Sequence, residues 1–157
     1  MYQPKHFELL DKALSYQLIE DMGFGLLTSY HKGNLETDFA PFYLDAENDC
    51  LLTHLAKVNP HVSQVLKAEV LRIVFQGPHT YISPGWYSDP QNVPTWNYIA
   101  IEVEAVPSLL DNNELLDLLT KLSQKHEAQF EKPWTMDTLN PKKLDAMTRA
   151  IVGFRFE

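Results

Sequence analysis

The sequence has 157 residues, of which 45% are hydrophobic and 22% are charged. Both values are typical of one soluble globular domain with a sizeable core, so we expect a single domain over residues 1–157. Thirteen lysines and arginines face 21 aspartates and glutamates, which gives a formal net charge of −8 at pH 7. This charge repels phosphate polyanions and acidic lipids, so it disfavours direct DNA binding by the chain alone.

Cysteine usage and hydropathy indicate the compartment. The only cysteine, Cys50, excludes an intramolecular disulfide and a cysteine-built metal site, which fits a reducing, cytoplasmic environment. Polar residues interrupt the N-terminal segment and the leucine-rich stretch Leu115–Leu122, so we predict neither a signal peptide nor a membrane contact.

The first eighty residues carry one helix signal and several strand signals. Asp11 is placed to cap a helix with an apolar stripe that ends near Met22. Two apolar runs around a Gly/Asn turn predict a hairpin, and three further short strands are separated by a helical turn opened by Asn59-Pro60. The predicted strands are 24–30, 35–44, 50–54, 70–77 and 80–82. This pattern predicts an α+β fold built on a small antiparallel β-barrel with flanking helices.

The second half begins with a loop and ends with two helices. Ser83–Thr95 is rich in Pro, Gly and Asn and is predicted to be irregular, and 97–107 is predicted as the last long barrel strand. Asp111 and Glu114 form a capping-box pattern for a helix that runs to about residue 130. A second helix, capped by Asn140, is expected to stop at Gly153 before a strand-like ending.

One segment with chemical potential lies at the end of the third predicted strand. Thr53, His54 and Lys57 place a hydroxyl, an imidazole and an ammonium group next to the predicted helical turn at Asn59. Free N–H groups at the start of a helix favour an anion, so a phosphomonoester fits this segment. The alternative is structural: Asn59 caps a short helix and Lys57 extends into solvent.

A second segment combines aromatic residues with proline. Phe75–Tyr87 and Val93–Tyr98 together contain two tryptophans, several tyrosines and three prolines. Such a loop is typical of a rigid wall against a flat ring or against another subunit. The alternative is a small hydrophobic core beneath a long loop.

Generic catalytic and metal motifs are missing from the sequence. Gly23-Phe24-Gly25 lacks the third glycine of a dinucleotide fingerprint, and His126-Glu127 lacks the second histidine of a zinc-protease helix. We therefore assign no metal ligand and no catalytic residue. His54, His61 and His79 remain candidates for acid–base work because of the intrinsic pKa of imidazole.

Three blocks resemble the PaiB family, whose members are described as FMN-binding negative transcriptional regulators. The blocks are HLAKVNP at His54–Pro60, FQGPHTYISPGWY at Phe75–Tyr87 and VPTWNY at Val93–Tyr98. Their order and spacing match the family, and YQPKHF at Tyr2–Phe7 is similar to its opening. The resemblance implies a split β-barrel, a homodimer, and FMN bound between the subunits.

The resemblance also implies roles for individual residues. Lys57 would pair with the FMN phosphate, and Thr53 and His54 would offer hydrogen bonds from the end of the strand. Tyr81 and Trp96 would shield the isoalloxazine ring. The cofactor-binding residues expected in this way are Thr53, His54, Lys57, Asn59, Tyr81, Ser83 and Trp96.

Two features depart from the family pattern. Phe39 stands where the family usually has histidine, close to where the flavin lies in split barrels. The family also usually continues beyond the Gly153-Phe154 pair through a further segment, which this sequence is expected to lack. Both departures from the family pattern affect whether this chain is expected to retain FMN.

The sequence leaves several functions open. The first is an FMN-binding, dimeric split-barrel protein of the PaiB type with a negative role in transcription, although no helix-turn-helix signature is present. The second is a flavin-dependent oxidoreductase, in which FMN carries the electron chemistry. A haem or metal binder that uses the histidines, and a dimeric scaffold that has lost its cofactor, are the remaining alternatives.

Overall fold

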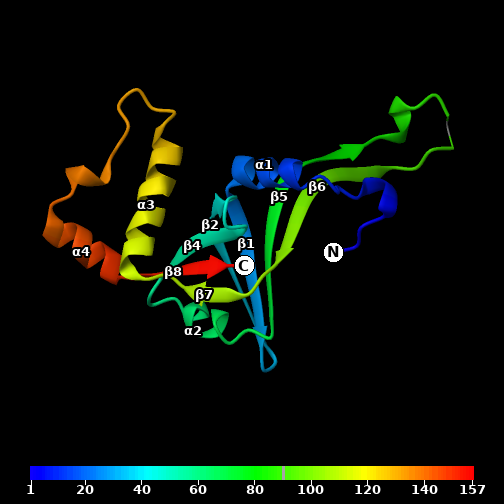
Figure 1. Cartoon of the computed structure of the whole chain (residues 1–157). Coiled ribbons are helices and arrows are strands. Elements are labelled where there is room, and N and C mark those ends of the chain that lie inside the picture. Colours follow the sequence, from blue (N-terminus) through cyan, green and yellow to red (C-terminus); the bar gives the residue numbers. More distant parts are fainter. Residues whose placement is uncertain (90) are drawn as a thin grey trace.

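Two four-stranded antiparallel sheets form the centre of the computed structural model, which describes residues 1–89 and 91–157 (Figure 1). The strand orders are β2-β1-β5-β6 and β3-β4-β8-β7. The strands are β1 (Phe24–His31), β2 (Asn34–Pro41), β3 (Tyr43–Asp45), β4 (Cys50–Ala56), β5 (Val70–Ile82), β6 (Thr95–Glu104), β7 (Pro107–Leu109) and β8 (Ile151–Phe156). The predicted α+β class with an antiparallel barrel-like core is confirmed, and the two sheets do not join into one closed ring of strands.

Four α-helices flank the sheets, and three of them begin at the caps predicted from the sequence. The helices are α1 (Lys12–Met22), α2 (His61–Val65), α3 (Asn112–Glu127) and α4 (Pro141–Arg149), with short 3₁₀ turns at Lys5–Phe7, Pro84–Trp86 and Met136–Thr138. Asp11 accepts hydrogen bonds from two backbone N–H groups of α1, and Asn140 accepts one from Lys143. Asp111 and Glu114 form the full capping box of α3.

The main core lies between the facing sides of the two sheets. Its fully buried members include Leu27 and Phe75 from the first sheet and Phe154 from the second. Phe42 joins the two sheets: it follows β2, precedes β3, and packs its ring against the edge of Phe75. The run predicted as one strand over 35–44 is therefore two strands in different sheets, because the chain turns inward at Phe42.

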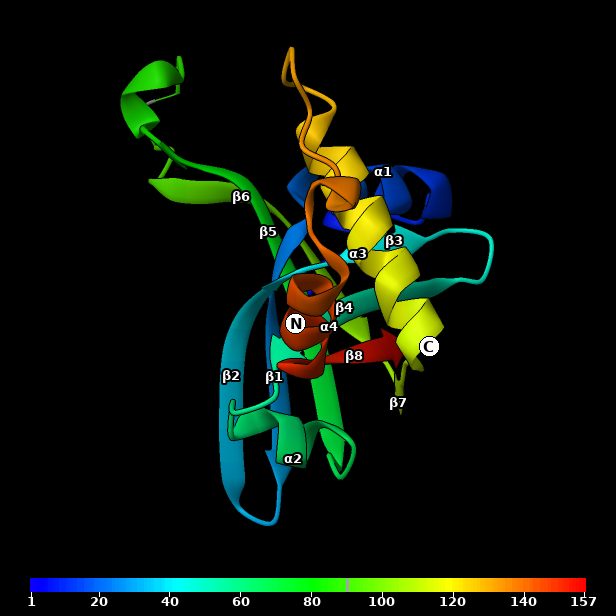
Figure 2. The ribbon, with the colours of Figure 1, turned by 90° about the vertical axis from the view of Figure 1, so that its left-hand side faces the viewer.

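A second core lies between the outer face of the second sheet and α3. Cys50 and Leu52 of β4 pack against Leu118 and Leu122 of α3. Figure 2 shows α3 lying across this sheet, with the chain between α3 and α4 extending beyond its end. No helix within the described residues combines the length and the apolar character that a membrane crossing requires.

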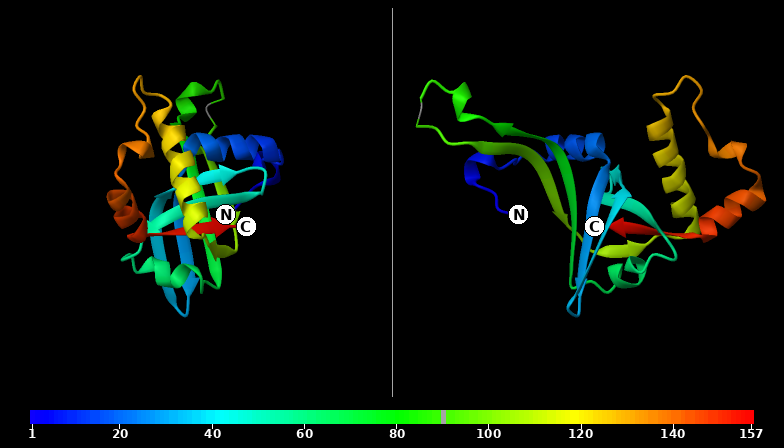
Figure 3. Two further views of the ribbon diagram at one scale, coloured as in Figure 1. Left: turned by 60° about the vertical axis from the view of Figure 1, so that its left-hand side comes forward. Right: turned by 180° about the vertical axis from the view of Figure 1, so that it is seen from behind.

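Strands β5 and β6 extend beyond the barrel as a long arm (Figures 1 and 3). The sequence predicted two strands here, but β5 is continuous and contains a β-bulge between Gln76 and His79. Pro78 lies in this bulge, where the regular ladder is interrupted and a missing N–H is tolerated. Gly77 is closely approached by Met22 of α1 and Ile99 of β6, so a side chain at this position would crowd both.

The C-terminal region differs from the sequence prediction. Helix α4 ends at Arg149, and Gly153 lies inside β8 instead of stopping the helix. A Cβ atom at Gly153 would come within 2.9 Å of a methyl carbon of Leu110, so the glycine permits this close approach. The strand-like ending predicted after Gly153 is part of β8, a central strand of the second sheet, whereas β7 was not predicted.

Candidate functional site

Thr53 and His54 are adjacent on β4 and therefore point to opposite faces of the sheet. Thr53 is fully buried, and its hydroxyl donates a hydrogen bond of 2.5 Å to the Pro41 carbonyl oxygen. His54 faces α3 and lines a cavity there with Pro41. The structure therefore does not bring the two side chains together on one surface.

Lys57 follows β4 in an exposed loop. Its backbone N–H donates to the Ala150 carbonyl oxygen at 2.8 Å, which attaches the loop to the end of α4. Its ammonium nitrogen lies 3.4 Å from the Arg149 carbonyl oxygen and forms no salt bridge with the described residues. Lys57 is thus a cation on a fixed backbone with freedom to meet an anion.

Asn59 lies one residue before Pro60, the N-cap position of α2, so the structural alternative placed the cap one residue too early, although the Asn59 side chain does bind the start of the helix. Its side-chain oxygen accepts a hydrogen bond of 2.9 Å from the His61 N–H, and its carbonyl oxygen accepts one from Val62. The Ser63 N–H donates to the Pro60 carbonyl oxygen. The expected free N–H groups for an anion are therefore occupied within the chain, and an anion near this loop depends on Lys57.

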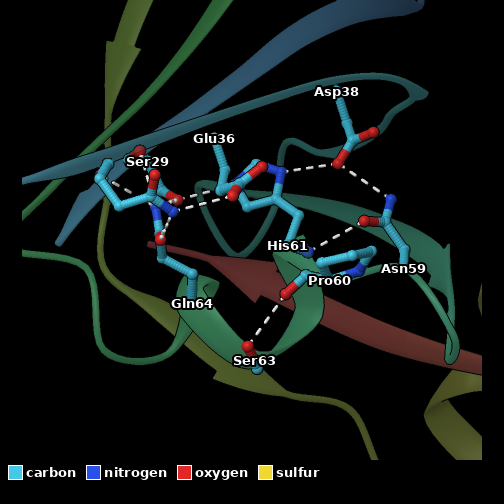
Figure 4. Close-up of polar contacts among 9 residues, drawn as sticks. Ser29, Glu36, Asp38, Asn59, Pro60, His61, Ser63 and Gln64 are labelled. Atoms are coloured by element: carbon cyan, nitrogen blue, oxygen red, sulfur yellow. Dashed lines mark hydrogen bonds and ion pairs between the residues drawn. The ribbon is translucent and has the colours of Figure 1, made fainter.

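A buried hydrogen-bonded chain connects α2 to the β1–β2 hairpin (Figure 4). His61 Nδ1 lies 2.7 Å from a carboxylate oxygen of Asp38, and His61 Nε2 lies 2.7 Å from the Ser29 hydroxyl oxygen. Because a carboxylate only accepts, Nδ1 carries the proton, and in neutral His61 the Nε2 atom accepts from Ser29. Asn59 also donates to Asp38, at 2.9 Å. This chain fixes the loop that carries Lys57.

The serine, histidine and aspartate of this chain have the connectivity of a nucleophilic triad, but burial gives them a different role. Ser29 and His61 are both almost completely inaccessible to solvent. Gln64 additionally donates to the Ser29 hydroxyl and carbonyl oxygens, at 3.0 Å each. A substrate has no access to the Ser29 oxygen, so the chain is a structural anchor. Sequence reasoning missed it because its members come from three elements without a common motif.

The three other expected site residues lie on the arm. Tyr81 of β5 pairs in register with Trp96 of β6, and their rings meet edge to face with centroids 6.0 Å apart. Ser83 accepts a hydrogen bond from the Gly85 N–H and caps the 3₁₀ turn at the tip. Both rings are exposed, and the arm extends away from α2 and the loop preceding it (Figure 3). Within one chain, the arm residues and Lys57 are not brought together.

A shallow cavity of about 370 Å³ lies at the base of the arm, on the outer face of the first sheet. Its apolar wall includes Phe24 and Phe39, whose rings are stacked with an interplanar angle of 6° and centroids 5.8 Å apart. Gln76 and His79 contribute polar groups on the other side. Phe39 is 68% exposed, so the residue that departs from the family pattern presents a bare ring at this cavity.

No group of three or more metal-ligating side chains is assembled in the described part of the chain. Burial lowers the pKa of His54, which favours its neutral form. The groups available to a ligand are therefore the Lys57 ammonium, which has no carboxylate partner, together with exposed aromatic rings and neutral or solvent-facing imidazoles. These groups suit the phosphate and the flat ring system of a flavin nucleotide.

The sequence matches, over residues 1–157, the family described as "Putative FMN-binding domain". It is also 33% identical to "Protease synthase and sporulation protein PAI 2" of Bacillus subtilis, in an alignment that covers 100% of this chain and 76% of the relative. The chain therefore belongs to this FMN-binding family of PaiB-like proteins, which confirms the resemblance seen in the sequence. FMN is the cofactor that this family assignment identifies.

Solved flavoprotein structures share the fold. The "FAD and Heme binding protein" of Mycobacterium smegmatis superimposes with a TM-score of 0.67 at 9% identity, covering 94% of this chain and 66% of that one. The "Flavocytochrome Anf3" of Azotobacter vinelandii gives a TM-score of 0.69 at 8% identity, covering 98% and 67%. The fold is that of the split-barrel flavoproteins, as expected.

Proposed function

We propose that the protein is a dimeric, FMN-dependent regulator of the PAI 2 type, with each flavin site completed by a second copy of the chain. The observation that carries this proposal is the separation of the two groups of site residues within one chain. Lys57 lies beside α2, whereas Tyr81 and Trp96 stand exposed on an arm that reaches away from the barrel (Figure 1). In the dimer, the arm of a second copy supplies Tyr81 and Trp96 to the site that contains Lys57 of the first copy.

Each residue of the proposed site has a physical role. Lys57 holds the phosphate through a charge-assisted contact, and Asn59 keeps its loop in place through Asp38. Thr53 and His54 form the strand end behind the loop, one on each face. Tyr81 and Trp96 of the second copy cover the flat ring, and Ser83 holds the turn at the tip of the arm. FMN, when bound, supplies electron transfer.

The exposed apolar surface supports the dimer. Trp86, Trp96 and Tyr98 on the arm and Phe24 and Phe39 at its base are each more than half exposed. A soluble monomer rarely exposes large apolar patches, and two-fold homodimers are the commonest assemblies that cover such surfaces. We expect an interface of roughly 2,000 Å² or more, in the obligate class.

We propose that regulation proceeds through the state of the flavin or through protein partners, without specific contact to duplex DNA. All three arginines of the sequence, Arg72, Arg149 and Arg155, are paired with carboxylates. The arginines are therefore already engaged by carboxylates, and the lysines that could contact phosphate belong to a chain with a net charge of −8. An electrophoretic shift assay at 150 mM salt with a genomic fragment pool tests this, and a discrete complex that survives non-specific competitor would overturn it.

The proposal places the protein in the cytoplasm. The single thiol, Cys50, is buried against α3, and burial raises its pKa, so it is poorly suited to disulfide exchange. A chain without a disulfide suits the reducing compartment in which FMN-dependent regulators act.

Lys57→Ala tests the flavin site directly. Because the ammonium binds the phosphate and supports no core contact, the variant should fold normally and bind FMN roughly ten- to hundred-fold more weakly. Riboflavin, which lacks the phosphate, should bind wild type and variant equally. Lys67→Ala, at an exposed lysine just after α2, is the matched control. Equal losses for FMN and riboflavin would show that Lys57 supports the fold instead.

The dimer has its own test. Trp96→Ser removes an exposed ring that the proposal places in the interface, and aromatic interface residues of this kind contribute about 2 kcal/mol or more. Sedimentation at micromolar concentration should show a dimer for wild type and a shift toward monomer for the variant. A wild-type protein that sediments as a monomer would remove the basis for a shared flavin site.

A flavin-dependent oxidoreductase is the second candidate. The observation that favours it is the cavity beside His79 and Gln76, which leaves room for a substrate next to an imidazole. A visible spectrum of the purified protein separates flavin bands from the Soret band of a haem protein. Turnover of a reduced nicotinamide with the FMN-loaded protein would then favour the enzyme over the regulator.

A further inference from the structure

A second cavity lies on the opposite side of the barrel from the arm, between β4 and the C-terminal part of α3. Its volume is about 210 Å³, and its apolar walls include Pro41, Leu122 and the ring of Trp134. Trp134 is held over the cavity because its backbone N–H donates to a Glu127 carboxylate oxygen at 2.8 Å. Neither the arm nor the Lys57 ammonium lines this space.

His54 gives the cavity a polar group that the protein leaves unused. Its Nδ1 atom is buried and has no hydrogen-bond partner among the described residues. A buried N–H without a partner is rarer than a bare acceptor, so the favoured tautomer carries its proton on Nε2. His54 lines the cavity, and in this tautomer Nε2–H is the donor that its ring can offer to a ligand.

Two of the other polar groups that line the cavity are acceptors, and the third, the imidazole of His126, can donate or accept. The Ser123 hydroxyl donates its own proton to the Leu119 carbonyl oxygen at 2.7 Å, so its oxygen offers only lone pairs to the cavity. Glu127 adds a carboxylate that accepts from Trp134. A group that both accepts from His54 and donates to one of these oxygens would satisfy the site, and a hydroxyl group does both.

We propose that this cavity binds a small phenolic compound, meaning a single aromatic ring that carries a hydroxyl group. The apolar walls and the indole of Trp134 suit the ring, while the carboxylate of Glu127 disfavours an anionic substituent. The size agrees, because an apolar cavity of roughly 150 Å³ takes up benzene. The cavity is smaller than the pockets of roughly 300 Å³ or more that hold drug-sized ligands, which favours a single-ring ligand.

The test uses 4-fluorophenol as the probe and fluorobenzene as its analogue without the hydroxyl, both titrated into the FMN-loaded full chain and followed by ¹⁹F NMR. Wild type should bind 4-fluorophenol about tenfold more tightly than fluorobenzene, as one hydrogen bond provides. His54→Leu should bind the two compounds with equal affinity. Its affinity for 4-fluorophenol should fall to that for fluorobenzene, and its affinity for fluorobenzene should stay unchanged. His6→Leu, at an exposed histidine far from β4 in the sequence, is the matched control and should behave like wild type.

Further readouts distinguish this proposal from the flavin site. Added phenol should not displace the flavin, and Ser123→Leu, at a residue outside the proposed flavin site, should leave the absorbance of bound FMN unchanged. Ser123→Leu, which fills the cavity from α3, should abolish binding of both probes. The proposal is overturned if wild type binds neither probe, if His54→Leu weakens both equally, or if the probe and FMN compete.

Discussion

Strand β5 runs through two regions of very different character. Its first half lies in the barrel, where Phe75 is 0% exposed and packs against Phe42 from the link between the sheets. Its second half belongs to the arm, where Tyr81 is 45% exposed and its ring meets that of Trp96 on the opposite strand. The Gln76–His79 bulge divides the two halves.

The difference shows that one strand serves two purposes. Aromatic side chains before the bulge are buried by the fold of a single chain, so they stabilise the barrel. Aromatic side chains after it gain little from that fold, and their burial depends on a second molecule or a ligand. The barrel can therefore be tested by unfolding, and the arm by association and binding.

The largest expected effect is that of Phe75→Ala. Removing a fully buried ring leaves a cavity in the barrel and should lower the free energy of unfolding by about 3–5 kcal/mol. Urea denaturation under dilute, monomeric conditions provides the measurement. Tyr81→Ala, on the same strand, should change it by less than about 0.5 kcal/mol. Comparable losses in the two variants would show that the arm is part of the folding unit.

A smaller effect is expected in the polar anchor of the barrel. His61→Ala leaves the buried Ser29 hydroxyl and the Asp38 carboxylate without their shared partner. The buried Ser29 hydroxyl, which loses its acceptor, should cost about 1–3 kcal/mol of unfolding free energy, whereas Asp38 is partly exposed and keeps its hydrogen bond from Asn59. Ser83→Ala removes an exposed cap from the arm and should cost less than about 1 kcal/mol. A His61 variant as stable as the Ser83 variant would argue against the anchor.

The smallest effect concerns the pH dependence of stability. Burial lowers the pKa of His54 below its ordinary value of 6.5, with His126 and Glu127 lining the same cavity. Below pH 6.5 the unfolded chain takes up a proton that folded His54 resists, so stability falls as the pH drops toward the lowered pKa. Melting temperatures measured from pH 7 to pH 5 should decline less steeply for His54→Leu than for wild type. Parallel curves would remove His54 as a contributor.

Local signals in the sequence predicted local structure well. Asp11, Asp111 and Asn140 each cap the helix that they were expected to cap, because capping depends on neighbours within three residues. Phe42 and Gly153 were placed wrongly. Their positions depend on contacts with Phe75 and Leu110, which the local pattern does not contain.

The same difference between local signals and long-range contacts applies to the candidate site. The period of a strand determines that Thr53 and His54 point apart, and this could have been deduced from the sequence. The chain Ser29–His61–Asp38 could not, since it joins β1, α2 and β2 through side chains that carry no shared motif. Whether the arm meets Lys57 of another copy is a property of two chains, so one sequence cannot encode it as a local pattern.

The central position of β8 has a consequence for biosynthesis. In the second sheet β4 pairs with β8, and even the nearest partners are residues 56 and 151. At about 5–20 residues per second, the ribosome needs on the order of 5–20 seconds to make the intervening chain. During this interval the leucine-rich strand β4 has one edge without a partner strand. Until β8 emerges, the edge of β4 that β8 covers is unpaired, and exposed edges of this kind are where nascent chains aggregate.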